Sequence, residues 1–182
     1  MRRAQDVAVV GIFSALVVGS DFALYPLYGI KLMDTLVFFV AFAFGARASV
    51  GVAVISETTW SYVSPIGAAG VITPFLVGGE LLFVLAGWWA SKAWGDRSKL
   101  LSPNAIFIGA LMLICAFVWD FETNAATALI AGWPTVTLQS VGAWELSGIP
   151  FAVVHEAADF VLGMVLIPAI LMVVPRTREA GP

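Results

Sequence analysis

The chain contains few of the residue types on which the functions of most soluble proteins depend. Its 182 residues contain one cysteine and one histidine, and only 12% are charged, about half the usual share of about 25%. The single cysteine, Cys115, excludes an intramolecular disulfide and a cysteine metal cluster, and its apolar surroundings are typical of a small buried residue. The chain also lacks a glycine-rich phosphate-binding loop. We therefore do not expect it to hydrolyse ATP by itself, and we predict no enzyme.

Hydrophobic residues are abundant and make up 60% of the chain. A bilayer core about 30 Å thick takes roughly 20 helical residues per crossing, so several crossings leave almost no room for a soluble domain. The opening Met1-Arg2-Arg3 imitates a secretory signal, but Asp6 interrupts it and we expect no cleavage. We predict one all-α integral membrane domain over residues 1–182, with six transmembrane helices near 4–24, 32–46, 48–62, 71–94, 104–130 and 149–174. Between the second and third of these, Gly45 is expected to form a tight turn.

Basic residues fall almost entirely on one side of this predicted bundle. If the N-terminus is cytoplasmic, eight of the nine basic residues lie in cytoplasmic segments, and only Lys31 lies outside. The eight are Arg2, Arg3, Arg47, Lys92, Arg97, Lys99, Arg176 and Arg178. This is the asymmetry of the positive-inside rule, and it predicts that both termini are cytoplasmic. The longest outer loop is expected at 131–149.

Apart from Asp6 at the inner end of the first span, every acidic residue within the predicted spans lies in the outer half of the membrane, and Asp21 and Asp34 border the same level. Ionisable groups in a span cost about 2.5–3.5 kcal/mol each and normally face the protein interior or a wet cavity. Scattered structural residues would have no reason to prefer one leaflet, so the bias predicts an outward-facing pocket above an apolar floor, not a channel. The predicted pocket residues are Glu57, Trp60, Glu80, Trp119, Asp120, Asn124, His155, Glu156 and Asp159.

The charge of this set indicates what the pocket would accept. It has many carboxylates, one histidine and no Arg or Lys within the spans, which favours a cationic or neutral polar ligand. Trp60 and Trp119 could stack on a flat ring or hold a cation. We expect the acids and Asn124 to make polar contacts, and His155 to make a hydrogen bond set by Asp159. For each residue the alternative is a structural role, in which it links neighbouring helices.

Two further patterns were weighed. His155-Glu156 followed by Asp159 is similar to the HExxH zinc helix, with Asp in place of the second histidine, but one histidine in the whole chain makes a catalytic zinc site improbable. We predict neither a metal site nor a cofactor. In the first span, Gly11, Ala15 and Gly19 form a stripe of small residues that permits close approach of another helix. That helix could be an internal neighbour or a separate subunit.

The layout resembles the substrate-binding S components of energy-coupling factor (ECF) transporters. The similarity covers nearly the whole chain, with six spans in about 180 residues and a first helix rich in small residues. The local resemblances are the runs IKLMD at 30–34, FGARASVG at 44–51, TN at 123–124 and GIPF at 148–151, together with the acidic Glu57.

This resemblance implies a high-affinity vitamin or micronutrient receptor in a prokaryotic cell membrane that is not itself an ATPase. It implies association with a transmembrane coupling subunit and with ABC-type ATPase subunits, with Gly11, Ala15 and Gly19 as a docking face. The outer segments 21–31 and 61–70 would act as lids. The ligands of the family include thiamine, riboflavin, biotin, folate and cobalamin, and we lean toward a thiamine-like or other heterocyclic ligand. The histidine-rich start of the nickel and cobalt members is absent here.

Two rival interpretations stay open. One is a cation- or proton-coupled secondary transporter, in which the same carboxylates carry the coupling ion. The other is an intramembrane enzyme, which would require bound zinc and would depend on Glu156.

Overall fold

The computed structural model describes residues 2–94 and 103–173, and all regular secondary structure within these ranges is helical. The helices are α1 (Arg2–Leu24), α2 (Met33–Phe44), α3 (Ala46–Val63), the short 3-10 helix η1 (Gly70–Ile72), α4 (Thr73–Ala93), α5 (Pro103–Gly132) and α6 (Leu138–Val173). The all-α prediction is confirmed for these residues. Four of the predicted cytoplasmic cations, Arg97, Lys99, Arg176 and Arg178, lie outside the described residues.

Four helical segments are long and apolar enough to cross a membrane: Ala4–Leu24, Gly70–Ala93, Asn104–Gly132 and Leu138–Val173. The chain thus has the make-up of a helical membrane protein. The helix α2 is different, because its 12 residues extend only about 18 Å at 1.5 Å per residue. Residues 33–42 of α2 are all buried, and α2 contacts each of the other five α-helices. It is the central core helix around which the others pack.

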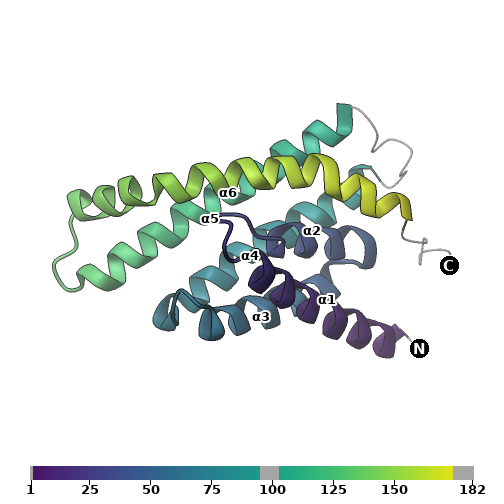
Figure 1. Ribbon diagram of the computed structural model, residues 1–182, viewed down its shortest axis with the longest axis horizontal. Coiled ribbons are helices and arrows are strands. Elements are labelled where there is room, and N and C mark those ends of the chain that lie inside the picture. The colour runs from purple at the N-terminus through teal and green to yellow at the C-terminus, as the bar shows by residue number, and fades with distance from the viewer. Residues whose placement is uncertain (1, 95–102, 174–182) are drawn as a thin grey trace.

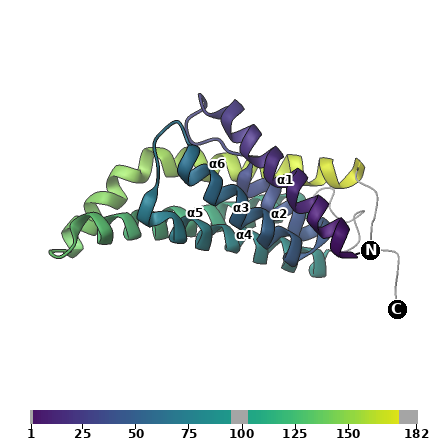
Figure 2. The ribbon, with the colours of Figure 1, turned by 90° about the horizontal axis from the view of Figure 1, so that it is seen from below.

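Successive helices run in opposite directions, so that α1 begins and α6 ends at the same end of the molecule (Figure 1). The turn between α2 and α3 lies at that end too. There Gly45 has φ +100°, a backbone conformation that favours glycine, which confirms the predicted tight turn. At the opposite end, the hairpin of α5 and α6 extends well beyond the other helices (Figure 2).

Glycines allow the core helices to approach closely. A Cβ atom on Gly87 of α4 would lie 2.3 Å from the carbonyl oxygen of Phe38 in α2, so only glycine permits this crossing. A Cβ atom on Gly109 of α5 would lie 2.6 Å from the carbonyl oxygen of Phe160 in α6. Such contacts are the usual basis of packing between membrane helices, where small residues let two backbones meet.

The predicted outer loop at 131–149 is mostly wrong, because α6 already begins at Leu138. Its start is capped reciprocally: the Ser140 amide donates to Oγ1 of Thr137 at 3.1 Å, and the Thr137 amide donates to Oγ of Ser140 at 3.0 Å. This resembles a capping box, with Ser in place of Glu or Gln. Pro150, which sequence analysis placed at the start of a span, lies inside α6.

The small-residue stripe of α1 faces outward. Gly11, Ala15 and Gly19 are all exposed, and a Cβ atom added to either glycine would meet no atom within 4 Å. Within the described residues the stripe therefore has no internal neighbour. Instead α1 packs on α3 through Gly51, whose Cβ position lies 2.9 Å from the Val10 side chain.

Candidate functional site

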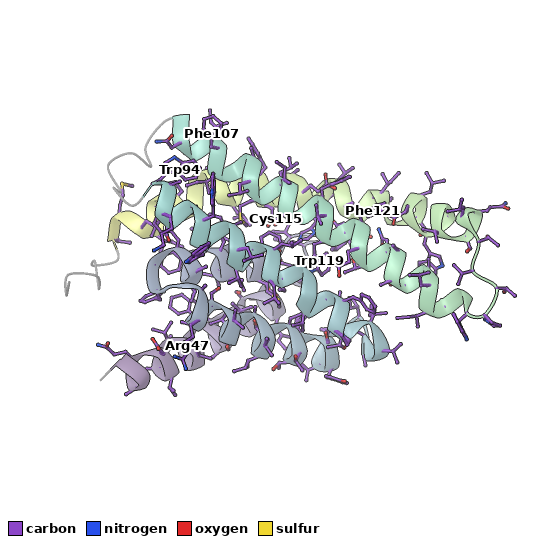
Figure 3. The ribbon with its side chains drawn as sticks, turned by 180° about the vertical axis from the view of Figure 1, so that it is seen from behind. Arg47, Trp94, Phe107, Cys115, Trp119 and Phe121 are labelled. Atoms are coloured by element: carbon purple, nitrogen blue, oxygen red, sulfur yellow. The ribbon has the colours of Figure 1, made fainter. Side chains whose placement is uncertain are left out.

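A cavity of about 500 Å³ lies where α1 and α3 end and α4 begins. Residues from two connecting segments cover it, Tyr25–Lys31 after α1 and Ser64–Ile72 after α3. Aromatic side chains supply much of its wall, namely Tyr25, Tyr28, Trp60, Trp119 and Phe151. The cavity thus lies away from the Gly45 turn, and Figure 3 shows Trp119 far from Arg47 and Trp94 along the bundle.

Both covering segments are anchored to the helices. The first is held by Asp21 near the end of α1, whose Oδ1 accepts a hydrogen bond from the Leu32 amide at 3.1 Å. Within it, Gly29 has φ +75°, and its Cβ position lies 3.1 Å from Val154 of α6. The second segment folds back on α3, because the Ala69 amide donates to the Ser61 carbonyl at 2.7 Å. These contacts place both segments over the cavity as a partial roof.

Three of the predicted pocket residues line this cavity: Glu57, Trp60 and Trp119. The Trp119 indole fits against Gly79 of α4, where a Cβ atom would lie 2.2 Å from the ring. Its Nε1–H donates to the carbonyl of Leu76 at 3.2 Å. The glycine therefore makes room for the ring that forms part of the cavity wall.

Two carboxyl groups of the cavity wall have acceptor atoms without a partner. Glu57 accepts a hydrogen bond from the Ser61 hydroxyl on Oε1 at 3.1 Å, but its buried Oε2 has none. Asp21 likewise leaves its buried Oδ2 without a partner. Buried polar atoms are almost always hydrogen-bonded, so these two oxygens are available to accept hydrogen bonds from water or from a bound molecule.

Lys31 belongs to the same cavity, although sequence analysis assigned it only to an outer loop. It does lie in the segment between α1 and α2, but its Nζ is 4.2 Å from the centroid of the Trp119 ring, within the range of a cation–π contact. Burial disfavours its ammonium form, yet the nearby carboxylates of Asp34 and Glu57 outweigh burial and raise the pKa of Lys31 above its ordinary value. The acidic cluster therefore has a built-in cation.

A buried polar network lies next to the cavity and is organised by His155. The Nδ1 atom of His155 is 3.0 Å from Oδ2 of Asp120, and its Nε2 atom is 3.0 Å from Oδ2 of Asp34. His155 and Asp34 are fully buried and Asp120 is 4% exposed. One imidazole thus connects α2, α5 and α6. The rings of Trp119 and Phe151 flank it, with centroids 5.5 and 5.2 Å away.

The expected hydrogen bond between His155 and Asp159 does not form. The two residues share a face of α6, but both ring nitrogens of His155 are taken by carboxylates from other helices. Asp159 is fully buried, and neither of its oxygens has a hydrogen-bond partner. Glu80 is also fully buried, and its carboxyl group interacts with that of Asp34. Glu80, Asp120, His155 and Asp159 are therefore neighbours of the cavity that do not line it.

The remaining two predicted pocket residues, Asn124 and Glu156, lie elsewhere. Together with Asp120 they line a smaller crevice of about 280 Å³ between α5 and α6. In it the side-chain amide of Asn124 donates to Oε2 of Glu145 at 3.4 Å. Glu156 is half-buried there, while the neighbouring His155 faces the core.

Sequence reasoning missed several residues of the cavity. Asp21 was recognised only as bordering the polar level, and the aromatic side chains of Tyr28 and Phe151 were not considered. Asp34, which belongs to the neighbouring network around His155, was likewise recognised only as bordering that level. One signal was available, because Lys31 and Asp34 are three residues apart at the start of a helix. The proximity of Lys31 to Trp119 had no such signal, since 88 positions separate them in the sequence.

The fold and the site together define a helical membrane protein with a ligand-sized, aromatic cavity beside a buried charged network. No protein-family model, curated protein or solved structure matches the chain.

Proposed function

We propose that this chain is the membrane-embedded substrate-binding subunit of an ECF-type micronutrient uptake transporter. In this proposal it crosses a prokaryotic cell membrane with its six helices, and both termini are cytoplasmic. The observation that carries the proposal is the aromatic cavity of about 500 Å³ with two buried acceptor oxygens that lack partners. A binding subunit needs such a preformed site, and it needs no catalytic group.

The cavity suits a small heterocyclic molecule. Its volume lies within the range of about 300–1,000 Å³ that is common for small-molecule sites, and its aromatic rings can stack on a flat ligand. The charged residues that line it are Asp21, Glu57 and Lys31, two acids against one base. The unpartnered oxygens of the two acids would accept hydrogen bonds from ligand N–H or O–H groups. A cationic or neutral ligand fits these properties better than an anion.

The proposal also accounts for two features outside the cavity. The covering segments Tyr25–Lys31 and Ser64–Ile72 are placed to serve as lids, in agreement with the resemblance to ECF S components. The exposed stripe of Gly11, Ala15 and Gly19 would receive the transmembrane coupling subunit, because no part of the described chain covers it. ATP hydrolysis would then come from separate ABC-type ATPase subunits.

Binding can be tested without knowing the ligand in advance. Native mass spectrometry of gently purified protein should reveal a co-purified small molecule, since receptors of this kind bind tightly. Trp60→Ala and Glu57→Gln should each reduce its occupancy at least about tenfold, which corresponds to about 1.4 kcal/mol. Trp89→Ala is the matched control, because Trp89 is 52% exposed near the other end of α4. Equal losses in Trp60→Ala and Trp89→Ala would contradict the assignment of the cavity.

A cation- or proton-coupled secondary transporter remains the alternative, and the buried network around His155 favours it. Chains of Asp, Glu and His inside membrane proteins often carry protons or coupling ions. The two functions differ in a direct assay of the purified chain in liposomes. A secondary transporter would accumulate the ligand identified above when an ion gradient is applied, whereas a binding subunit alone would bind it without accumulation.

A further inference from the structure

The buried acidic residues outnumber the basic groups that could neutralise them. Six carboxyl groups, each at most 4% exposed, come from Asp21, Asp34, Glu57, Glu80, Asp120 and Asp159. Among the described residues, the basic side chains that interact with them are Lys31 and His155. A buried charge without a partner costs several kcal/mol, so the carboxyls that these two basic groups do not neutralise are either protonated or paired with a cation from outside the protein.

Three of these residues are arranged as metal ligands. Asp34 of α2 and His155 and Asp159 of α6 each offer one ligand atom, and the three atoms lie within 4.8 Å of one another. All three residues are fully buried. Because α2 and α6 are far apart in sequence, the set arises only from tertiary packing.

The hydrogen bond of His155 to Asp120 determines what its other ring nitrogen can do. In its imidazolium form His155 donates an N–H to each carboxylate, Nδ1–H to Asp120 and Nε2–H to Asp34, both at 3.0 Å. When a metal ion displaces the Nε2 proton, the Nδ1–H donation to Asp120 can persist, and the Nε2 lone pair and the Asp34 carboxylate both become available as ligands. A carboxylate that holds the distal N–H of a metal-bound histidine is a common supporting feature of metal sites.

Asp159 provides a second, independent observation in favour of a bound cation. Its side chain is fully buried beside His155, and both of its oxygens lack a hydrogen-bond partner. Unpartnered buried carboxylate oxygens of this kind are what a bound cation would satisfy.

We propose that Asp34, His155 and Asp159 bind a divalent transition-metal ion of the zinc class, with Asp120 orienting the imidazole. An imidazole ligand favours such ions over Mg²⁺ and Ca²⁺, which prefer oxygen ligands only. None of the three residues lines the 500 Å³ cavity, so this site is separate from the proposed ligand site. The metal would join α2 to α6 and stabilise the packing next to the cavity.

The test uses the full chain, purified with an affinity tag that contains no histidine and without chelators. Elemental analysis should find about one equivalent of zinc per chain. After treatment with EDTA, adding Zn²⁺ at about 100 times its dissociation constant should raise the melting temperature by about 5–10 °C, whereas Mg²⁺ should not. Asp159→Asn should abolish this shift, and Glu57→Gln, which changes another buried acid, should retain it.

A second measurement keeps the proposal testable if Asp159→Asn fails to fold. Co²⁺ added to the metal-free wild-type protein should produce a visible absorption band that an equivalent of Zn²⁺ removes. Absence of this band, or absence of any zinc-dependent thermal shift in the wild-type chain, would overturn the metal site. Ligand occupancy of the cavity in the same preparation is read separately by native mass spectrometry, so the failure of one proposal is distinguishable from the failure of the other.

Discussion

Removal of the Lys31 charge is the sharpest test of the electrostatic reasoning. Lys31 interacts with Asp34 and Glu57, and its ammonium lies over the Trp119 ring. In Lys31→Met the apolar stem is retained, but the carboxylates lose their cation. Leaving a buried carboxylate without its compensating cation costs about 3–5 kcal/mol. Because Lys31 is only half-buried, we expect a loss near about 3 kcal/mol, the lower end of that range.

This loss is large enough to measure by thermal unfolding in detergent. A chain of this size changes its melting temperature by about 2–4 °C per kcal/mol, so Lys31→Met should lower it by about 6–12 °C. The matched control is Lys92→Met, the same substitution at an exposed lysine in the last turn of α4. There the change in stability should stay within about 0.5 kcal/mol.

A double mutant tests the cause of the effect. If the loss comes from uncompensated negative charge, Lys31→Met combined with Glu57→Gln should recover about 1–3 kcal/mol relative to the sum of the single changes. Unchanged stability in Lys31→Met, or strictly additive effects in the double mutant, would refute the view that Lys31 neutralises the acidic cluster.

Further predictions concern single contacts. Gly79→Ala should cost about 1–3 kcal/mol, because the new Cβ would lie 2.2 Å from the Trp119 ring; unaltered melting and tryptophan fluorescence would contradict this. Thr137→Ala should cost about 1 kcal/mol through loss of the α6 cap, whereas Thr135→Ala, at an exposed threonine outside the helix, should have little effect on thermal stability. Gly19→Leu should not lower stability and should raise it by about 0.5–1 kcal/mol through helix propensity, since nothing lies within 4 Å of its Cβ position. If the stripe docks the coupling subunit, Gly19→Leu should nevertheless reduce co-purification of that subunit, and full recovery would exclude the stripe from the interface.

Sequence reasoning was most successful where a single residue determines the local geometry. The Gly45 turn was predicted because glycine tolerates a positive φ, and the structure confirms it. The outer loop predicted at 131–149 was mostly wrong, because α6 already begins at Leu138 and its Thr137–Ser140 cap lacks the usual acidic or amide partner. A capping signal is local, but whether a helix extends from it depends on which helix packs alongside.

Residue types and helical spacing alone indicated an apolar helical protein whose polar residues gather toward one end of its helices. This could be predicted without the fold, because a charged group in a membrane is costly in any arrangement of the helices. Spacing could not decide which acids share a cavity. The i,i+4 relation of His155 and Asp159 was read as a pair, yet the imidazole bonds to Asp34 and Asp120. Only the packing of α2 against α5 and α6 brings those carboxylates to the ring. In the same way, the Lys31 ammonium lies over Trp119 only because of how the segment after α1 folds. A contact between two distant segments depends on the three-dimensional arrangement and produces no periodic pattern in the sequence.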